Sequence, residues 1–452
     1  MATSRRDFIK TVGATAAVAG MSGLSGCARS TDRKQLIPEM APLEPPFRLS
    51  ESWYRQAIQR LQEKMDENRL DGMVFRDRWN IIYLSGLFHS TTERPFWLFV
   101  PKSGEPAIFG PGLDRDLVNT WWIKDFEWYF DFPHHGPFNQ VVYKAGPKVD
   151  LEAWMLSQVG KRGLQSGTLG IEKALPAETL KRWKKTLPRA RFKPAGDLTM
   201  KMRVVKMPEE IAMTQKAIDL HDHMLEYARA YILDRGTDAT DFEVRHATQA
   251  YGTELLMQWL KVDGKPHNGV GVSLRFGCRA GLATAYPHPN QFFYHKIEKG
   301  DAIQIASVIR IGGYGGEGYR ALQTHPMTDL HKKMWEVHTE QTNVQAGLCK
   351  AGTKCNEIAE EVLAIARDAG MEKYIYHRPA HGEGMEGHQE PYLSLGDETV
   401  LEEGMMFSNE PGLYNPEGGF GYNHSNNILV GQDRGIRMNK TPLTKEWCWL
   451  TL

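Results

Sequence analysis

The sequence predicts a two-domain protein, with an α/β amino-terminal domain followed by a larger α+β domain. Three observations support this. The chain has 452 residues, which is enough for two or three domains. Helix and strand patterns alternate up to about residue 201, and longer helices with antiparallel strand patterns follow. We therefore expect one domain at 47–201 and a second at 202–452.

Local patterns define the elements of the first domain. Residues 50–70, SESWYRQAIQRLQEKMDENRL, have the spacing of an amphipathic helix. Residues 71–77 and 80–87, DGMVFRD and NIIYLSGL, predict a strand, a turn and a second strand. The segment 169–188, LGIEKALPAETLKRWKKTLP, adds one more short strand and helix. Together these elements predict a small α/β domain.

Longer helices characterise the second domain. Pro208 suits the first turn of a helix, and Glu209 and Glu210 behind it match the helix dipole. Two further helices and two strands are predicted at 329–348, 354–368, 301–311 and 426–431. Long helices that flank antiparallel strands are typical of an α+β domain.

The chain begins with an export-type segment. Arg5 and Arg6 precede a small, mildly apolar run at 11–26, which is typical of a twin-arginine signal peptide at 1–26. This run is too short and too rich in Gly and Ala to span a bilayer stably. LSGC resembles a lipoprotein processing site, so we expect cleavage before Cys27 and acylation of its sulfur, although an ordinary signal with a chance cysteine is the alternative.

These features predict a periplasmic protein that reaches the membrane only through a lipid anchor. The proline-rich segment 27–46 then serves as a tether. Lys and Arg number 55 and so do Asp and Glu, and without a basic stripe no nucleic-acid partner is expected. An oxidising compartment permits a disulfide between Cys349 and Cys355, but buried free thiols are the favoured alternative.

One short segment contains several side chains that can bind a metal ion or transfer a proton. Residues 379–391, PAHGEGMEGHQEP, hold His381, His388 and several carboxylate or amide side chains between glycines. Imidazoles and carboxylates this dense hold a transition ion or perform acid–base chemistry, and one segment rarely supplies a whole site.

Four further segments give the chain a family resemblance. The segments are NIIYLSGLFHSTTERPFWLFVP, MRVVKMPEEIAMTQKA, HKIEKGDAIQI and LEEGMMFSNEPGLY. Together with PAHGEGMEGHQEP they resemble the creatinase/prolidase family, also called peptidase M24. The resemblance implies a creatinase-like amino-terminal domain and a pita-bread catalytic domain of the creatinase/aminopeptidase P type.

The resemblance also implies a ligand set. The two-metal peptidases of this family use two aspartates, one histidine and two glutamates. By motif these positions fall on Ala306, Glu317, His381, Glu410 and Ser425, with His424 as the alternative for the last. A methyl group cannot coordinate a cation and a serine hydroxyl is a poor ligand. We therefore expect no two-metal centre and no cofactor; the alternative is one divalent metal at Glu317, His381 and Glu410.

The remaining roles follow from the same motifs. The resemblance implies catalytic roles for His288, Glu317, His388 and Glu410, with the imidazoles exchanging protons and Glu317 acting as base or nucleophile. It implies substrate-binding roles for His381, Arg320, Phe88, His89 and Arg94. The last three lie in the loop LFHSTTERP, which in this family approaches the partner's pocket, so a homodimer is expected. Glu383 and Gln389 depart from the family pattern, and His134 and His135 are expected to be loop residues.

Three function classes follow. The first is a hydrolase that cleaves a C–N bond of a small zwitterionic or cationic metabolite, as in the creatinase and ectoine hydrolase branch. The second is a peptidase or dipeptidase with one metal that acts on Xaa-Pro bonds. The third is a catalytically inactive homologue that binds a ligand, because two metal-ligand positions are lost.

Overall fold

The computed structural model describes residues 49–89, 92–129, 150–262, 265–266, 271–288 and 294–452. The predicted signal, Cys27, His134 and His135 lie outside these ranges. Among the helices that can be described, none is both long and apolar enough to cross a bilayer. Four cysteines are described, all as free thiols, and Cys349 and Cys355 are buried, as the favoured alternative predicted.

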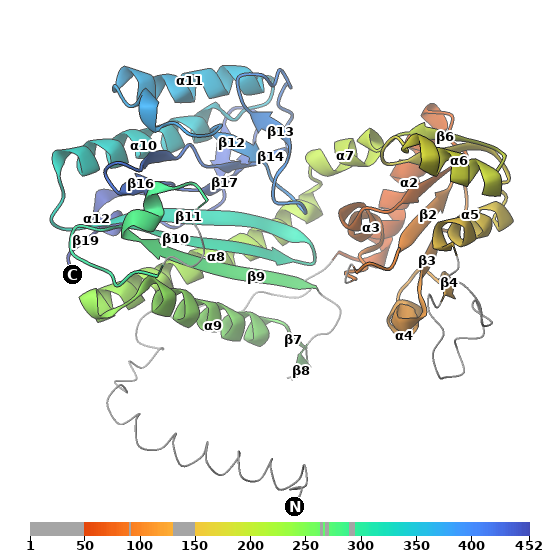
Figure 1. Ribbon diagram of the computed structural model, residues 1–452, viewed down its shortest axis with the longest axis horizontal. Coiled ribbons are helices and arrows are strands. Elements are labelled where there is room, and N and C mark those ends of the chain that lie inside the picture. The colour runs from red at the N-terminus through yellow and green to blue at the C-terminus, as the bar shows by residue number, and fades with distance from the viewer. Residues whose placement is uncertain (1–48, 90–91, 130–149, 263–264, 267–270, 289–293) are drawn as a thin grey trace, which may run out of the picture. The chain divides into compact units, whose positions relative to one another are not determined.

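The amino-terminal domain is built on a six-stranded mixed sheet (Figure 1). Its order is β4-β3-β2-β1-β5-β6, in which β2 runs antiparallel to β1 and β3 and the other neighbours are parallel. The strands are β1 (Gly72–Phe75), β2 (Trp97–Pro101), β3 (Ala107–Pro111), β4 (Asp125–Tyr129), β5 (Ser166–Ile171) and β6 (Arg189–Pro194). The predicted α/β class of this domain is confirmed.

Six helices in the described part of this domain accompany the sheet. They are α2 (Glu51–Glu67), α3 (Arg78–Ser85), α4 (Arg115–Asn119), α5 (Leu151–Lys161), α6 (Ala177–Thr186) and α7 (Asp197–Val204). The hydroxyl of Ser50 caps α2 by accepting a hydrogen bond from the backbone N–H of Trp53. Helix α2 buries one face, which includes Tyr54, Ile58 and Leu61, so the predicted amphipathic helix is confirmed.

The segment 80–87 differs from its prediction. It forms most of helix α3, not a second strand. The carboxylate of Asp77 accepts hydrogen bonds from the backbone N–H groups of Trp79 and Asn80, and Gly86 ends the helix in the left-handed conformation at φ 69°. The apolar run is buried on all sides. Periodicity alone cannot separate such a short buried helix from a strand.

The carboxy-terminal domain contains two main sheets. The first has the order β19-β11-β10-β9 and the second the order β13-β12-β14-β17-β18. The first consists of β9 (Val272–Ala280), β10 (Ala302–Ile311), β11 (Tyr314–Thr324) and β19 (Trp449–Leu450). The second consists of β12 (Ala380–Gly382), β13 (Gln389–Leu393), β14 (Met406–Asn409), β17 (Asn426–Val430) and β18 (Gly435–Arg437). Two short hairpins pair β7 (Lys261–Val262) with β8 (Lys265–Pro266) and β15 (Leu413–Asn415) with β16 (Phe420–Tyr422).

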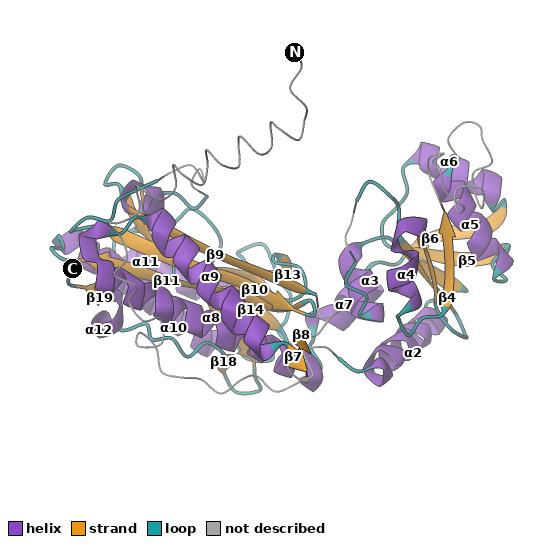
Figure 2. Cartoon of the chain, turned by 90° about the horizontal axis from the view of Figure 1, so that it is seen from below, coloured by secondary structure: helices purple, strands orange, loops and turns teal. Residues whose placement is uncertain are grey.

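Helices cover the outer faces of these sheets (Figures 1 and 2). Helices α8 (Pro208–Arg235) and α9 (Asp241–Trp259) pack on the first sheet. Helices α10 (Asp329–Leu348) and α11 (Cys355–Asp368) pack on the second, and the short α12 (Lys445–Cys448) lies against β11 and β19. The predicted helices and strands of this domain, and its α+β class, are confirmed. The inner faces of the two sheets are left to face each other.

Candidate active site

The β10–β11 hairpin forms one wall of the site. Its register pairs Ala306 with Tyr319 and Val308 with Glu317. Directly paired residues of antiparallel strands point to the same face, and so do residues two apart on one strand. Ala306, Tyr319 and Glu317 therefore share one face of the first sheet, and the hydroxyl of Tyr319 donates a hydrogen bond to the carboxylate of Glu317.

The second sheet supplies the opposite wall. His381 lies in β12, and Glu410 follows β14 directly. The Nε2 atom of His381 is 2.8 Å from Oε1 of Glu317 and 3.2 Å from Oε1 of Glu410. The Nδ1 atom of His381 is 3.1 Å from the carbonyl oxygen of Gly382, which fixes the ring. The two sheets thus meet at one imidazole between two carboxylates.

Burial and hydrogen bonding shift the pKa values of this cluster in opposite directions. Burial raises the pKa of Glu317, but hydrogen bonds from His381 and Tyr319 outweigh it and lower that pKa to about 2. Burial lowers the pKa of His381, but its bonds to Glu317 and Glu410 outweigh it and raise that pKa to about 11. Without a metal, His381 is therefore held as an imidazolium against the ionised carboxylate of Glu317.

His388 joins the cluster through ring stacking. Its ring lies 4.0 Å from that of His381, centroid to centroid, at an interplanar angle of 24°. Desolvation and the charge of His381 lower the pKa of His388, so this imidazole is neutral at pH 7. A neutral imidazole can accept a proton from water. The family motif predicts proton transfer for His388, and this residue lies with Glu317, His381 and Glu410.

The last ligand position corresponds to Ser425 in space. The hydroxyl of Ser425 lies 2.8 Å from that of Ser408 and 3.5 Å from the carbonyl oxygen of Glu317. His424 points away, toward α10. Its Nδ1 accepts a hydrogen bond from the backbone N–H of Ala321, its Nε2 bonds the hydroxyl of Thr339, and its ring stacks on His338.

The side chains present do not fit a two-metal centre. Ala306 offers a methyl group, and the Ser425 hydroxyl is bonded to that of Ser408. They do fit a single divalent ion, because ligand atoms of Glu317, His381, His388 and Glu410 all lie within 4.8 Å of one another. Such an ion would be held by two carboxylates and two imidazoles, and it would supply a Lewis acid for a substrate oxygen.

Arg320 does not face this cluster, which corrects its expected role in substrate binding. It is fully buried and three residues from Glu317, so it points to the opposite face of β11. Its guanidinium donates to four carbonyl oxygens and to Oδ1 of Asn426. The carbonyls belong to Tyr319, Ser425, Thr441 and Pro442. Arg320 therefore ties β11 to β17 and to the carboxy-terminal segment.

His288 lies outside the cluster. It is exposed and follows the turn η4 (Gly281–Ala285), three residues after that turn ends. Arg279 organises the chain just before it, because its Nη1 donates to the carbonyl oxygens of Tyr286 at 3.1 Å and Pro287 at 3.0 Å. The position of His288 is therefore coupled to an arginine on β9.

Arg279 is a site residue that the sequence motifs do not predict. It pairs with Gln304, so it shares a face with Ala306 two residues further along β10. Burial lowers the pKa of Arg279, and the charges or dipoles of Tyr414, Tyr319 and Glu410 act in the opposite direction. No family block contains this arginine, and the only signal in the sequence was its place on the strand before TAYPHPN.

The departures Glu383 and Gln389 lie directly behind His381. The buried carboxylate of Glu383 is 2.7 Å from the guanidinium of Arg310, and its other oxygen is 3.9 Å from Nδ1 of His381. Burial raises the pKa of Glu383 to about 8 against the influence of Arg310. Gln389 is also buried, and its amide has no partner among the described residues.

The amino-terminal loop residues have distinct environments. His89 is buried, stacks on Phe96 at 4.3 Å and has a pKa lowered by burial to about 4, so it is a core residue and not a substrate contact. The Arg78 guanidinium lies 4.7 Å from the centre of the Phe88 ring. Arg94 forms an ion pair with Glu93 at 2.7 Å.

Comparisons with known proteins agree with this architecture. Residues 58–205 match the model of the creatinase/prolidase N-terminal domain, and residues 212–432 match metallopeptidase family M24. The Xaa-Pro dipeptidase of Pyrococcus horikoshii is 26% identical over 387 residues, which cover 85% of this chain and 97% of that protein. The creatinase of a Bacillus species is 25% identical over 418 residues, with coverage of 89% and 94%.

A solved structure shares the fold. The prolidase of Thermococcus sibiricus has a TM-score of 0.71 and 21% identity, covering 88% of this chain and 99% of its own. The chain belongs to the M24 creatinase/prolidase family, and it combines the creatinase-type amino-terminal domain with the pita-bread catalytic domain. The predicted fold is thereby confirmed.

Proposed function

We propose that this M24-family hydrolase cleaves a C–N bond of a small zwitterionic or cationic metabolite and works without the two-metal centre. One observation carries the proposal: Ala306 has no ligand atom and Ser425 offers only a hydroxyl bonded to Ser408, while Glu317, His381 and Glu410 remain together at hydrogen-bond distances. The similarity to a creatinase supports this branch of the family.

The charges of the cluster favour a cationic group in the substrate. Within the cluster, the carboxylates of Glu317 and Glu410 outnumber the single imidazolium of His381, so its acidic groups exceed its basic group. An ammonium, amidine or guanidinium group of the substrate would compensate this charge beside Glu317 and Glu410. A substrate cation thus occupies the role that a metal ion has in the peptidases.

Arg279 suits the other end of a zwitterion. The guanidinium of Arg279 lies on the same face of the sheet as Ala306. This face has open space because Gly277 and Ala306 are small. A Cβ atom placed on Gly277 would still be 3.9 Å from the Cβ of Ala306. A guanidinium binds a carboxylate through two parallel hydrogen bonds. The substrate would therefore lie across β9–β11, with its anion toward Arg279 and its cation toward Glu317.

Proton transfer is assigned to the histidines. His388 is neutral and beside the cluster, so it accepts a proton from the attacking water. His288, at the end of the segment that Arg279 holds, is the residue that donates to the leaving nitrogen. Glu317 keeps its negative charge and orients the water or the electron-poor carbon.

A second candidate is a dipeptidase with one metal ion that acts on Xaa-Pro bonds. The convergence of ligand atoms from Glu317, His381, His388 and Glu410 within 4.8 Å favours it, and so does the similarity to Xaa-Pro dipeptidases. The two candidates differ in whether His381 keeps its proton, because metal binding would displace it.

Elemental analysis combined with a substrate panel separates them. The purified exported protein is assayed with creatine-like compounds, cyclic amidines and Xaa-Pro dipeptides, with and without a chelator. The proposal expects less than stoichiometric metal and chelator-resistant activity on a small nitrogenous compound. Stoichiometric Mn, Fe or Zn, with activity lost to the chelator and restored by the ion, would replace it with the second candidate.

Export and anchoring belong to the same proposal. Arg5, Arg6 and Cys27 form the predicted signal and acylation site. Replacing both arginines by lysine should trap the folded precursor in the cytoplasm. Cys27→Ser should release the mature protein from the membrane fraction after a salt wash, and protein that stays bound would contradict a lipid anchor.

We further propose a homodimer with a composite site. Arg94 and Phe88 of one subunit would reach the pocket of the other, as the family resemblance implies. Arg94→Ala and His288→Ala chains, each inactive alone, should regain part of the activity when co-expressed, because some mixed dimers hold one intact site. An active monomer in light scattering, or a dimer without complementation, would rule out the composite site.

A further inference from the structure

A strongly cationic surface lies on the amino-terminal domain, far in sequence from the catalytic residues. Residues 179–196 contain seven Lys or Arg and no Asp or Glu, although the whole chain balances 55 cationic against 55 acidic residues. We call these seven the basic face: Lys181, Arg182, Lys184, Lys185, Arg189, Arg191 and Lys193. The equal totals of cationic and acidic residues in the whole chain therefore do not reveal this local excess of positive charge.

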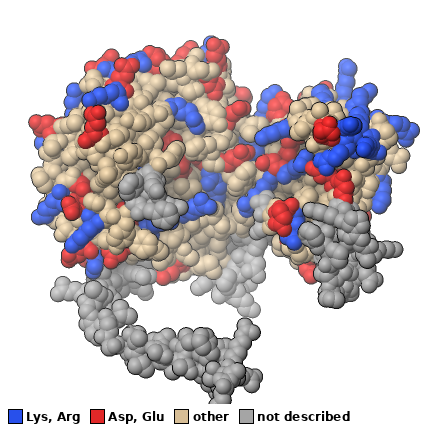
Figure 3. All heavy atoms as spheres, in the orientation of Figure 1, with Lys and Arg blue, Asp and Glu red and all other residues tan. Residues whose placement is uncertain are grey.

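The fold presents these residues to solvent. Helix α6 carries four of them and the edge strand β6 carries three. Trp183 anchors the helix from below: it is buried, packs on Trp97 and Phe192, and donates a hydrogen bond to Glu152. Six of the seven side chains are classed as exposed and Lys184 as half-buried. Figure 3 shows Lys and Arg atoms gathered over this part of the domain.

Most of these charges are not compensated. Arg182 pairs with Glu152 at 2.9 Å. Lys184, Arg191 and Lys193 bond only neutral oxygens, so their charges remain. Among the described residues, Lys181, Lys185 and Arg189 form no ion pair with a carboxylate. The basic face therefore keeps an excess of positive charge.

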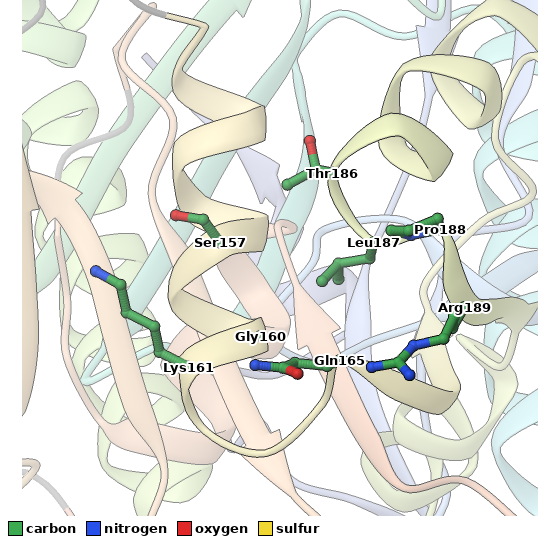
Figure 4. A pocket seen from close by; sticks show the side chains of 8 residues that line it. All are labelled: Ser157, Gly160, Lys161, Gln165, Thr186, Leu187, Pro188 and Arg189. Atoms are coloured by element: carbon green, nitrogen blue, oxygen red, sulfur yellow. The ribbon is translucent and has the colours of Figure 1, made fainter.

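A hollow of about 350 Å³ opens beside the basic face (Figure 4). It lies between α5 and the start of β6, with Lys161 and Arg189 on opposite sides and Gln165 between them. Its other lining residues are Ser157, Gly160, Thr186, Leu187 and Pro188. This volume is roughly ten times the ~30 Å³ that one water molecule occupies in the liquid. A phosphate headgroup therefore has room there.

We propose that the basic face docks on an anionic phospholipid surface, with a lipid phosphate between Lys161 and Arg189. Clustered Lys and Arg bind anionic bilayers electrostatically. Single-stranded nucleic acid would require exposed aromatic rings for base stacking, and Trp183 is buried here. The bilayer is therefore the better match to this chemistry.

The predicted anchor would place the domain near such a surface. Cys27 precedes the start of α2 at Glu51 by 24 residues, a chain that spans at most about 80 Å. That length lets the domain turn any face toward the bilayer. A lipid chain and a basic patch together give stable membrane attachment where one signal alone is reversible.

Vesicle flotation tests the proposal with the full chain carrying Cys27→Ser, so that no acyl group contributes. The patch variant adds Lys181→Glu, Lys185→Glu and Arg189→Glu. The matched control adds Lys299→Glu, Lys354→Glu and Lys373→Glu, three exposed lysines of the other domain with the same change in charge. Vesicles contain either phosphatidylcholine alone or phosphatidylcholine with one third phosphatidylglycerol.

We expect the parent and the control to bind the phosphatidylglycerol vesicles at least tenfold more tightly than the patch variant, and raised salt to abolish this difference. Binding through the predicted signal would be equal in all three proteins and would not require the anionic lipid. Equal affinity of patch variant and control would overturn the proposal. So would binding of random-sequence DNA through the same residues without binding to vesicles.

Discussion

The Nε2 atom of His381 lies 2.8 Å from Oε1 of Glu317, and both side chains are almost completely buried. The pKa of Glu317 falls to about 2 and that of His381 rises to about 11. Unfolded references are about 4.3 and 6.5. The contribution of Glu317 to stability is present above about pH 4.3 and lost as the pH falls toward 2. That of His381 is present below about pH 6.5 and lost as the pH rises toward 11.

The pair should therefore stabilise the fold most between about pH 4.5 and 6.5. Glu317→Gln removes the pair, so the loss of unfolding free energy should be largest in that window and smaller at pH 9. Urea unfolding at pH 5.5 and 9, with a chelator present, measures it. Glu357→Gln, an exposed carboxylate of α11, should show no such dependence. A loss that grows from pH 5.5 to 9 would contradict the imidazolium.

Sequence patterns predicted helices α8, α10 and α11 of the second domain because their signals are local, but they did not predict α9. Thr328 caps α10 and the helix keeps a long amphipathic pattern. The sequence pattern did not predict helix α3, because its apolar run is short and buried on all sides. Tertiary packing decides whether such a short apolar run forms a helix or a strand, and the local sequence pattern carries no information about that packing.

The site was predicted through motifs, which give positions but not side-chain directions. Glu317 and Arg320 belong to one motif, but three residues on a strand separate opposite faces, so only Glu317 reaches the cluster. The choice between Ser425 and His424 has the same origin, since neighbours on an extended chain point opposite ways. Arg279 could not be found, because its role depends on a strand that brings it beside Tyr319 and Glu410.

Arg279 should determine affinity for the substrate anion. Arg279→Gln removes a charge-assisted hydrogen bond of about 1.5–3 kcal/mol, so KM should rise roughly 10- to 100-fold with a smaller change in kcat. Steady-state kinetics on the substrate found in the panel measures this. Arg245→Gln, which changes an exposed arginine of α9, is the control. A substrate analogue without the anion should not distinguish Arg279→Gln from the parent, and a pure loss in kcat would assign Arg279 to positioning His288.

Arg320 should matter for stability. Arg320→Met removes all five hydrogen bonds of the guanidinium. The carbonyl oxygens of Tyr319 and Ser425 keep a backbone N–H donor. Three acceptors lose the arginine donor without such a replacement, and each unsatisfied group costs about 1–3 kcal/mol before relaxation. We expect the free energy of unfolding to fall by at least about 3 kcal/mol in urea titrations. Arg437→Met, an exposed arginine of β18, should change it by less than about 0.5 kcal/mol. An Arg320→Met protein of normal stability but raised KM would restore a substrate-binding role.

The two lost ligand positions give the sharpest test of the site. Ala306 shares its face with Glu317, and Gly277 beside it leaves room for a carboxylate. Ser425 lies against Glu317 from the other sheet. Ala306→Asp with Ser425→Glu would add two carboxylates beside Glu317, and together with His381 and Glu410 these residues make five ligands. Five such ligands are what a pair of divalent ions requires.

We expect this double variant to bind two Mn²⁺ or Co²⁺ ions per chain in calorimetric titrations, whereas the parent binds at most one. Ala306→Asn with Ser425→Gln is the matched control, because the amides have nearly the same shape without the negative charge that holds the ions. It should bind no more metal than the parent, and thermal unfolding would show that both double variants are folded. If the parent protein already binds two ions, other groups must supply the ligands that Ala306 and Ser425 lack. That result would contradict the proposal that the site works without a two-metal centre.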